Sequence, residues 1–72
     1  MEFRKVHRGS YKAVLSNTAD LWVEKDHKGW VWFVGRLDTD QRVYWCTAKI
    51  GPFETRREAL EDALKNYKNL LD

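Results

Sequence analysis

The sequence predicts an α+β fold, in which an antiparallel β-sheet of three to five strands carries one C-terminal amphipathic helix packed on one face. Two patterns predict it. Before residue 50, apolar side chains follow the two-residue period of strands, and from residue 55 they follow the 3.6-residue period of a helix. A chain of 72 residues forms a single domain, 1–72, with the sheet in about 3–49 and the helix in about 55–71.

The strand-like segments are separated by turns that contain glycine or aspartate. Strands are expected near residues 20–26, 30–37 and 42–49, with further edge strands at Phe3–His7 and Tyr11–Leu15. The run KDHKGW at 25–30 is typical of a type I turn followed by a glycine in the left-handed conformation. That turn pairs Asp26 with Trp30, Glu24 with Trp32, and Val23 with Phe33.

The run DTDQ at 38–41 predicts a second turn. Asp38 and Asp40 are expected to accept hydrogen bonds from local amides there, as aspartates in turns commonly do. We expect this turn to pair Leu37 with Arg42, Gly35 with Tyr44, Val34 with Trp45, and Phe33 with Cys46.

The helix begins with a capping box at residues 55–58. The Thr55 hydroxyl accepts the amide of Glu58, and the Glu58 side chain reaches back to the cap. One apolar stripe follows, made of Leu60, Ala63, Leu64, Tyr67 and Leu71. We expect Ala63, Leu64 and Tyr67 to pack on the sheet.

The predicted register sorts the side chains, because neighbours across a ladder lie on the same face. The face suited to the helix holds Leu21, Val23, Val31, Phe33, Tyr44, Cys46 and Ala48. The other face holds Trp22, Glu24, Trp30, Trp32, Val34, Arg36, Val43, Trp45 and Thr47, and so all four tryptophans.

One helix covers only one face, so the tryptophan face needs a cover or a ligand. Three alternatives are open: residues 3–15 fold over it as a lid or extra strand, a homodimer buries it, or it is a working ligand surface. A slip of one residue at the second turn would move Val43 and Trp45 to the other side.

Composition favours a binding protein over an enzyme. No phosphate loop or nucleophile motif appears, and no cofactor is expected. His7 and His27 lie far apart, so no metal site is expected. The 13 Lys and Arg against 11 Asp and Glu give a net charge of +2, which permits nucleic-acid binding without demanding it. The positive surplus lies in the sheet half and the N-terminus.

The remaining composition signals concern location. The single cysteine, Cys46, excludes an intrachain disulfide, fits a reducing compartment and is expected to pack as a small hydrophobe. No apolar run approaches the ~20 residues of a membrane span, and the N-terminus is charged where a signal peptide is apolar. A cytoplasmic protein without membrane contact is therefore expected.

Three motifs carry a family resemblance. GWVWFV at 29–34 is similar to the pattern G-x-W-x-[AV]-x-[IV], RVYW at 42–45 to R-V-W-L, and GPFETRREAL at 51–60 to G-x-F-x-T-x-x-E-A. Together they resemble the second strand, third strand and strand-to-helix turn of the AP2-type DNA-binding domain and of the arm-type N-terminal domains of phage and transposon integrases. The resemblance spans residues 28–67, treats Cys46–Ile50 as an insertion and leaves the family's first strand unmatched.

In that family a three-stranded sheet backed by one helix enters the major groove. The resemblance implies that bases and phosphates are contacted by Trp30, Trp32, Arg36, Arg42 and Trp45, with Trp22 and Lys28 nearby. Arg4, Lys5 and Arg8 would contact phosphates as a basic arm.

The leading hypothesis is a small non-enzymatic protein that binds double-stranded DNA as an accessory or regulatory factor of a phage or mobile element. The alternative is a protein–protein interaction module, such as a phage-type inhibitor or adaptor, that uses the same tryptophan-rich face. Aromatic side chains on a sheet also suit the stacking of unpaired bases.

Overall fold

The computed structural model describes residues 1–71. Within them lie six strands, an α-helix and a 3₁₀ helix, so the strands exceed the predicted three to five. Their bounds are β1 Arg4–His7, β2 Ser10–Ser16, β3 Ala19–Asp26, β4 Gly29–Leu37, β5 Val43–Cys46, β6 Ile50–Phe53, α1 Arg56–Asn66 and η1 Tyr67–Leu70.

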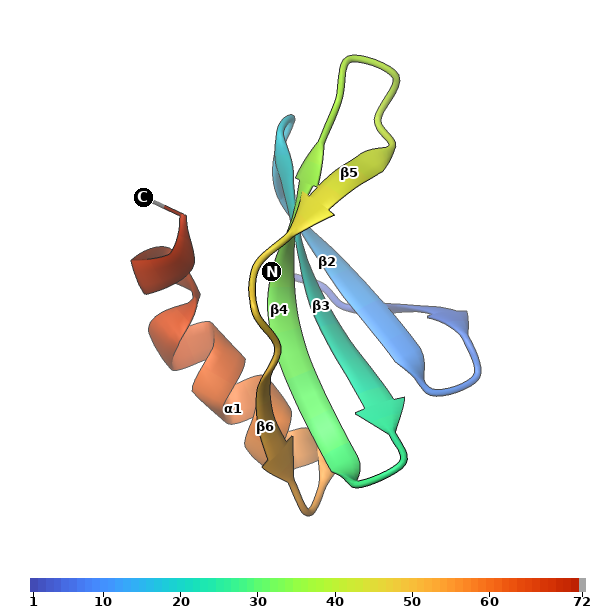
Figure 1. Ribbon diagram of the computed structural model, residues 1–72, viewed down its shortest axis with the longest axis vertical. Helices are drawn as coiled ribbons and strands as arrows, with labels where there is room; N and C mark the ends of the chain where they lie inside the picture. The colour runs from blue at the N-terminus through green and yellow to red at the C-terminus, as the bar shows by residue number, and fades with distance from the viewer. Residues whose placement is uncertain (72) are drawn as a thin grey trace.

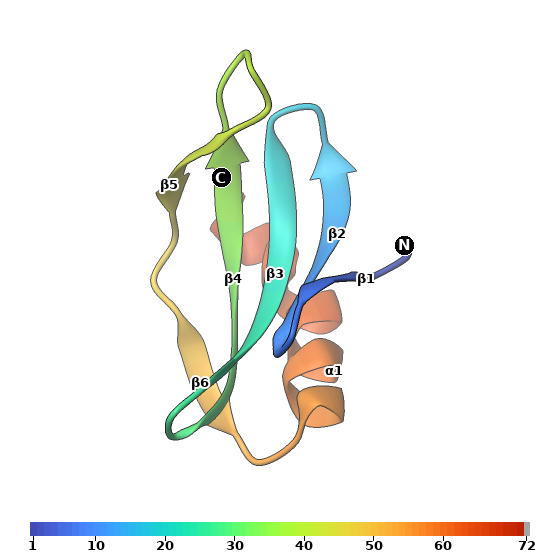
Figure 2. The same cartoon turned by 90° about the vertical axis from the view of Figure 1, so that its right-hand side faces the viewer.

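The strands form one antiparallel sheet with a helix on one side, which confirms the α+β class. Neighbouring strands follow the order β1-β2-β3-β4-β5, and β6 pairs with β4 beyond the end of β5. Helix α1 packs against β3, β4 and β6. Figure 1 shows the helix on one side of the sheet while β1 and the β4–β5 loop bend away from it, and Figure 2 shows the helix behind the strands.

Strand β6 was not predicted, because Gly51-Pro52 resembles a plain turn. In the structure Ile50 pairs with Trp32 and Phe53 pairs with Trp30. Gly51 makes the pairing possible with a φ of +136°, since a Cβ at this position would lie 2.7 Å from the carbonyl oxygen of Trp30. The chain therefore adds a short strand before it reaches the helix.

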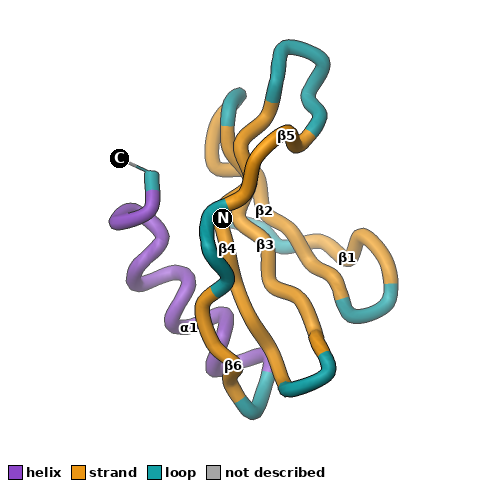
Figure 3. Tube along the Cα trace, viewed as in Figure 1, coloured by secondary structure: helices purple, strands orange, loops and turns teal. Residues whose placement is uncertain are grey.

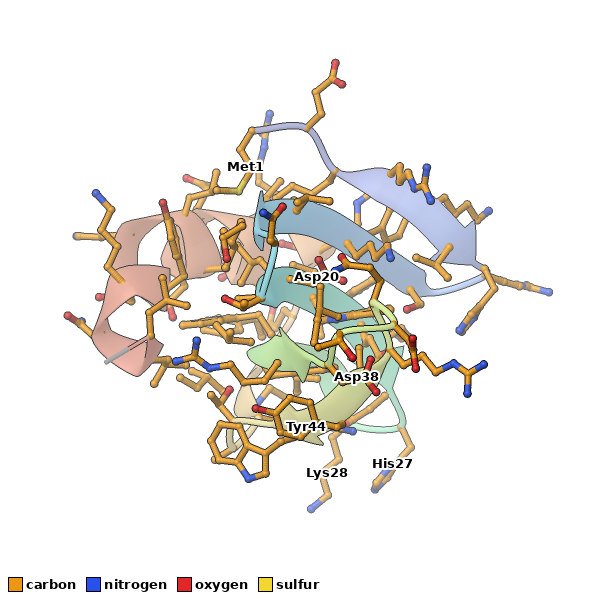
Figure 4. The ribbon with its side chains drawn as sticks, turned by 90° about the horizontal axis from the view of Figure 1, so that it is seen from above. Met1, Asp20, His27, Lys28, Asp38 and Tyr44 are labelled. Carbon is orange, nitrogen blue, oxygen red and sulfur yellow. The ribbon has the colours of Figure 1, made fainter. Side chains whose placement is uncertain are left out.

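The predicted β3–β4 register is wrong by one residue. Asp26 pairs with Gly29 and not with Trp30, so the turn contains only His27 and Lys28, which project from the molecule (Figure 4). The Asp26 carboxylate accepts the Lys28 amide at 2.8 Å and closes this shorter turn. Gly29 takes a φ of +151°, outside the left-handed conformation expected of it, and stays in the ladder.

The predicted β4–β5 register is also wrong. Leu37 pairs with Val43, but Arg36 pairs with Trp45, so Tyr44 is an extra residue on β5. It forms a β-bulge, a common feature of edge strands. Beyond it Gly35 pairs with Cys46, two residues from its predicted partner. Tyr44 and Cys46 are both exposed. Cys46 therefore does not pack as the small hydrophobe that the sequence predicted.

These registers overturn the prediction that all four tryptophans share the uncovered face. We call the side covered by α1 the helix face; it carries Tyr11, Ala13, Leu21, Val23, Lys25, Trp30, Trp32, Val34 and Arg36. We call the other side the opposite face; it carries Ser10, Lys12, Asp20, Trp22, Glu24, Phe33 and Gly35. Of the four tryptophans, only Trp22 lies on the opposite face, where Glu24 also lies as predicted.

The first fifteen residues do not form a lid. β1 and β2 continue the sheet beside β3, which confirms the strands predicted at Phe3–His7 and Tyr11–Leu15 and not an extra strand folded over the tryptophan face. The opposite face is partly filled by its own side chains instead. Trp22 stacks on Phe33 with ring centroids 6.1 Å apart, and Lys12 and Lys49 each place an ammonium group over one of the two rings.

The helix begins as predicted. Thr55 Oγ1 accepts the Glu58 amide at 3.1 Å, and its hydroxyl donates to the Glu58 carboxylate. The α-helix ends at Asn66 and continues as the 3₁₀ turn η1 (Figure 3), short of the predicted residue 71. Ala59 and Ala63 are buried on the sheet, whereas Leu64 faces solvent and does not pack there.

Candidate functional site

Helix α1 leaves one end of the helix face uncovered. The helix begins at Arg56, and the buried side chains beneath it include Val23 and Trp32. Beyond them lies a hollow of about 530 Å³ to which no residue of α1 contributes. We call it the cationic hollow; its lining residues are Lys5, Arg8, Gly9, Tyr11, Lys25 and Trp30.

Two aromatic rings line the cationic hollow. The rings of Tyr11 and Trp30 lie with centroids 6.3 Å apart and their planes tilted by 44°. Each ring carries a cation: the Lys25 ammonium lies 5.7 Å from the centroid of Trp30, and the Arg56 guanidinium lies 4.5 Å from that of Tyr11. Arg56 also donates a 2.5 Å hydrogen bond to the Tyr11 hydroxyl oxygen.

Sheet pairing places these residues. Lys25 pairs with Trp30 across the β3–β4 ladder, and Lys5 pairs with Tyr11 across the β1–β2 ladder. The Lys25 amide donates a 2.7 Å hydrogen bond to the carbonyl of Gly9, which holds the β1–β2 turn against β3. Arg8 is therefore brought close to Lys25 by backbone contacts and not by side-chain attraction.

The charge around the cationic hollow is uncompensated. Within residues 1–71 an ion pair joins Lys12 to Asp20, and the His27 ring lies 4.0 Å from the Asp26 carboxylate. Lys5, Arg8, Lys25 and Arg56 have no carboxylate partner there. The nearest acids along β3 are engaged elsewhere. Glu24 accepts a 3.0 Å hydrogen bond from Ser10 on the opposite face.

Asp26 is engaged as well. Its hydrogen bond from the Lys28 amide lowers the pKa of its carboxyl below the ordinary value, so the group is charged at neutral pH and held in its own turn. Among the described residues, none that lines the cationic hollow carries a carboxylate. The hollow therefore combines three cations with two aromatic rings, and Arg56 lies next to it over the ring of Tyr11. This composition suits an anionic ligand with flat apolar groups.

A second hollow, of about 670 Å³, lies along β1 and β2 and suits such a ligand less well. Its lining residues are Glu2, Phe3, Arg4, Lys12 and Val14. It includes the carboxylate of Glu2, and the charge of Lys12 is already paired with Asp20, which is 2% exposed.

Three of the residues predicted to bind a ligand lie together at the cationic hollow: Lys5, Arg8 and Trp30. Arg4 does not join them, since it pairs with Lys12 and lies exposed on β1. Lys28 is exposed in the β3–β4 turn.

The other predicted residues lie elsewhere. Trp32 is fully buried under the helix, and Trp22 is half-buried on the opposite face. Arg36, Arg42 and Trp45 lie at the other end of β4, around β5. Arg36 donates a hydrogen bond to the backbone carbonyl of Leu71, which ties η1 to the sheet.

The sequence did not indicate Tyr11, Lys25 or Arg56. Lys25 faces Trp30 only in the two-residue turn, so a correct β3–β4 register would have identified it. Tyr11 and Arg56 are 45 residues apart in the chain and meet only because α1 docks on the sheet with its first residue near Tyr11.

Comparison with known protein families, with curated proteins and with solved structures finds no match. In the described part of the chain, no group of three or more His, Cys, Asp or Glu is arranged to hold a metal ion. No helix within residues 1–71 has the length and apolar character needed to cross a membrane.

Proposed function

We propose that this protein binds nucleic acid, DNA foremost, through the cationic hollow and without a catalytic step. One observation carries the proposal: three cations of the hollow, Lys5, Arg8 and Lys25, have no carboxylate partner in residues 1–71 and line it with two adjacent aromatic rings. Arg56, also without a carboxylate partner there, lies over one of these rings. Phosphates attract the cations, and each contact releases a counterion from the nucleic acid. Aromatic rings add contacts to sugars and bases.

The modest net charge of +2 agrees with this proposal, because binding depends on where the charges lie. The acidic residues of the helix balance the total without entering the hollow: Glu58 is bonded to Thr55, and Asp62 to Trp32. A local positive surface therefore remains on a nearly neutral protein. A role as accessory factor of a phage or mobile element rests on the sequence resemblance alone.

The test is a salt titration with fluorescently labelled DNA. We compare Lys5→Gln/Lys25→Gln with Lys65→Gln/Lys68→Gln, a control pair that removes the same charge from the end of the helix and η1. The hollow pair should weaken binding and reduce the slope of log K against log salt by about 0.7–0.9 per lost phosphate contact. The control pair should change the affinity and the salt slope only slightly. Equal effects of the two pairs, or no binding near 50 mM salt, would overturn the proposal.

A protein partner is the second candidate, favoured by edge strand β5. Val43, Tyr44 and Trp45 are 41%, 68% and 55% exposed, and no other described strand pairs with the outer side of β5. An exposed apolar edge can accept a further strand from a protein partner or from a second copy. Light scattering tests the homodimer: the mass should rise with concentration in the native chain and stay monomeric in Trp45→Lys. If the native chain has the mass of a monomer at every concentration, the homodimer is ruled out.

A further inference from the structure

The cationic hollow adjoins a smaller cavity, distinct from the hollow along β1 and β2. This cavity measures about 190 Å³ and is lined by Phe3, Tyr11, Val23, Arg56 and Leu60. Tyr11 lines both spaces, so its ring stands between the cationic hollow and an apolar cavity at the start of α1. The guanidinium of Arg56 lies at this boundary, over the ring of Tyr11.

From this arrangement we infer that the ligand of the cationic hollow is an unpaired strand, one base of which lies against Tyr11 at the mouth of the apolar cavity. The inference rests on the proposed function and specifies its ligand. The strand's phosphates lie along Lys5, Arg8 and Lys25, which surround the hollow. The base lies beside the Tyr11 ring and the Arg56 guanidinium that covers it, and takes apolar contacts from Phe3 and Leu60.

The argument for an unpaired strand comes from which ligand atoms the rings can reach. In a duplex the base faces are stacked on one another, and the outer surface offers phosphates, sugars and base edges. Tyr11 lines both the cationic hollow and the apolar cavity of Phe3 and Leu60, and a stacked duplex offers no base face that could enter this cavity. An unpaired strand bends into the hollow and exposes its base faces to the rings.

The chemistry of the smaller cavity points the same way. Its walls are mostly apolar, and its polar groups are the Tyr11 hydroxyl and the Arg56 guanidinium. A flat heterocycle suits such a space, because its faces need apolar contact and its edge needs donors or acceptors. Arg56 already stacks on an aromatic ring and presents further N–H groups for a base or a phosphate.

The experiment compares a labelled single strand of mixed sequence with the duplex of the same length by fluorescence anisotropy. The native chain should bind the single strand at least about tenfold more tightly, since ring contacts add to phosphate contacts only there. Tyr11→Leu should lower single-strand affinity about tenfold and duplex affinity much less, because a duplex does not expose its base faces to the ring. Tyr11→Phe is the matched control: it loses the hydrogen bond to Arg56, keeps the ring and should retain most of the affinity.

A second measurement needs no substitution. A single strand carrying 5-iodouracil is crosslinked to the native chain by light, and the attached peptide is mapped. Attachment at Tyr11, Trp30 or Phe3 supports the inference, and attachment only elsewhere overturns it.

The outcomes separate the two proposals. Binding of neither nucleic acid overturns the proposed function itself. Equal affinity for strand and duplex, sensitive to Lys5→Gln/Lys25→Gln but not to Tyr11→Leu, overturns the unpaired ligand and leaves nucleic-acid binding standing. A preference for duplex has the same consequence.

Discussion

The indole of Trp32 donates a 2.8 Å hydrogen bond from Nε1 to Asp62 Oδ2 on the helix. Trp32 lies at the centre of β4 and is fully buried, so its N–H would otherwise have no partner. The other oxygen of Asp62 accepts a hydrogen bond from Asn66 one turn later. The sequence-based hypothesis placed Trp32 on a ligand surface, whereas here this residue joins the sheet to the helix.

The first prediction concerns this bond. Asp62→Ala should lower the free energy of unfolding by about 1–3 kcal/mol, because it leaves the buried indole N–H unsatisfied. Asp62→Asn should lose less, since its amide oxygen can still accept. Glu61→Ala, an exposed neighbour, is the control and should change stability by less than about 0.5 kcal/mol. Urea unfolding measures the stability of all three variants. If Asp62→Ala has the same free energy of unfolding as the native chain, the bond does not have the role given to it here.

Local signals in the sequence predicted the elements of the fold well. The capping box at Thr55 gave the start of the helix, and the expected strands appear within a few residues of their predicted bounds. Pairing between strands was less predictable, because each register depends on a one-residue choice. At the β3–β4 turn the choice is made by the hydrogen bond of Asp26 to Lys28, and along β5 by the bulge at Tyr44.

The candidate site was predicted only in part, for the same reason. The basic N-terminal segment indicated Lys5 and Arg8, and the family resemblance together with the predicted tryptophan face indicated Trp30. An error of one residue reverses the faces of a strand, so the tryptophans were assigned to a common surface that does not exist. The contribution of Arg56 depends on where the helix docks, and that position depends on the register of the whole sheet.

The second prediction tests the close approach of Gly29 on β4 to strand β6. A Cβ at Gly29 would lie 2.5 Å from the carbonyl oxygen of Phe53, and its φ of +151° is unfavourable for any other residue. Gly29→Ala should therefore cost about 2 kcal/mol or more. Gly9→Asn is the control; at φ +77° it lies in the left-handed region that asparagine tolerates, and should cost less than about 1 kcal/mol. Comparable losses would argue against this geometry of β4 and β6.

The third prediction concerns acid sensitivity at Asp26. The Lys28 amide lowers the pKa of this carboxyl in the folded state, so its contribution is present above the ordinary pKa and is lost as pH falls through the lowered value. Native stability should therefore fall more steeply below about pH 4 than that of Asp26→Asn, which keeps an acceptor but does not titrate. Thermal unfolding at several pH values measures the difference. If the native chain and Asp26→Asn lose stability equally as the pH falls below about 4, Asp26 contributes nothing to the acid response.

The fourth prediction separates structural from ligand-binding arginines. Arg36 donates to the carbonyl of Leu71, so Arg36→Met should release η1 from β4 and cost about 1 kcal/mol of stability. Arg42 is exposed in the β4–β5 loop, where its backbone alone bonds to Asp38, so Arg42→Met should change stability by less than about 0.5 kcal/mol.

Neither substitution should alter nucleic-acid affinity or its salt dependence, since both arginines lie at the far end of β4 from Trp30. The family resemblance predicts the reverse, because there both arginines contact DNA. Anisotropy titrations of these two variants and of Lys5→Gln/Lys25→Gln therefore decide whether the ligand binds at the cationic hollow or along β5. If the arginine variants weaken binding and flatten its salt dependence while the lysine pair does not, the ligand lies along β5, and the cationic hollow is not the binding site.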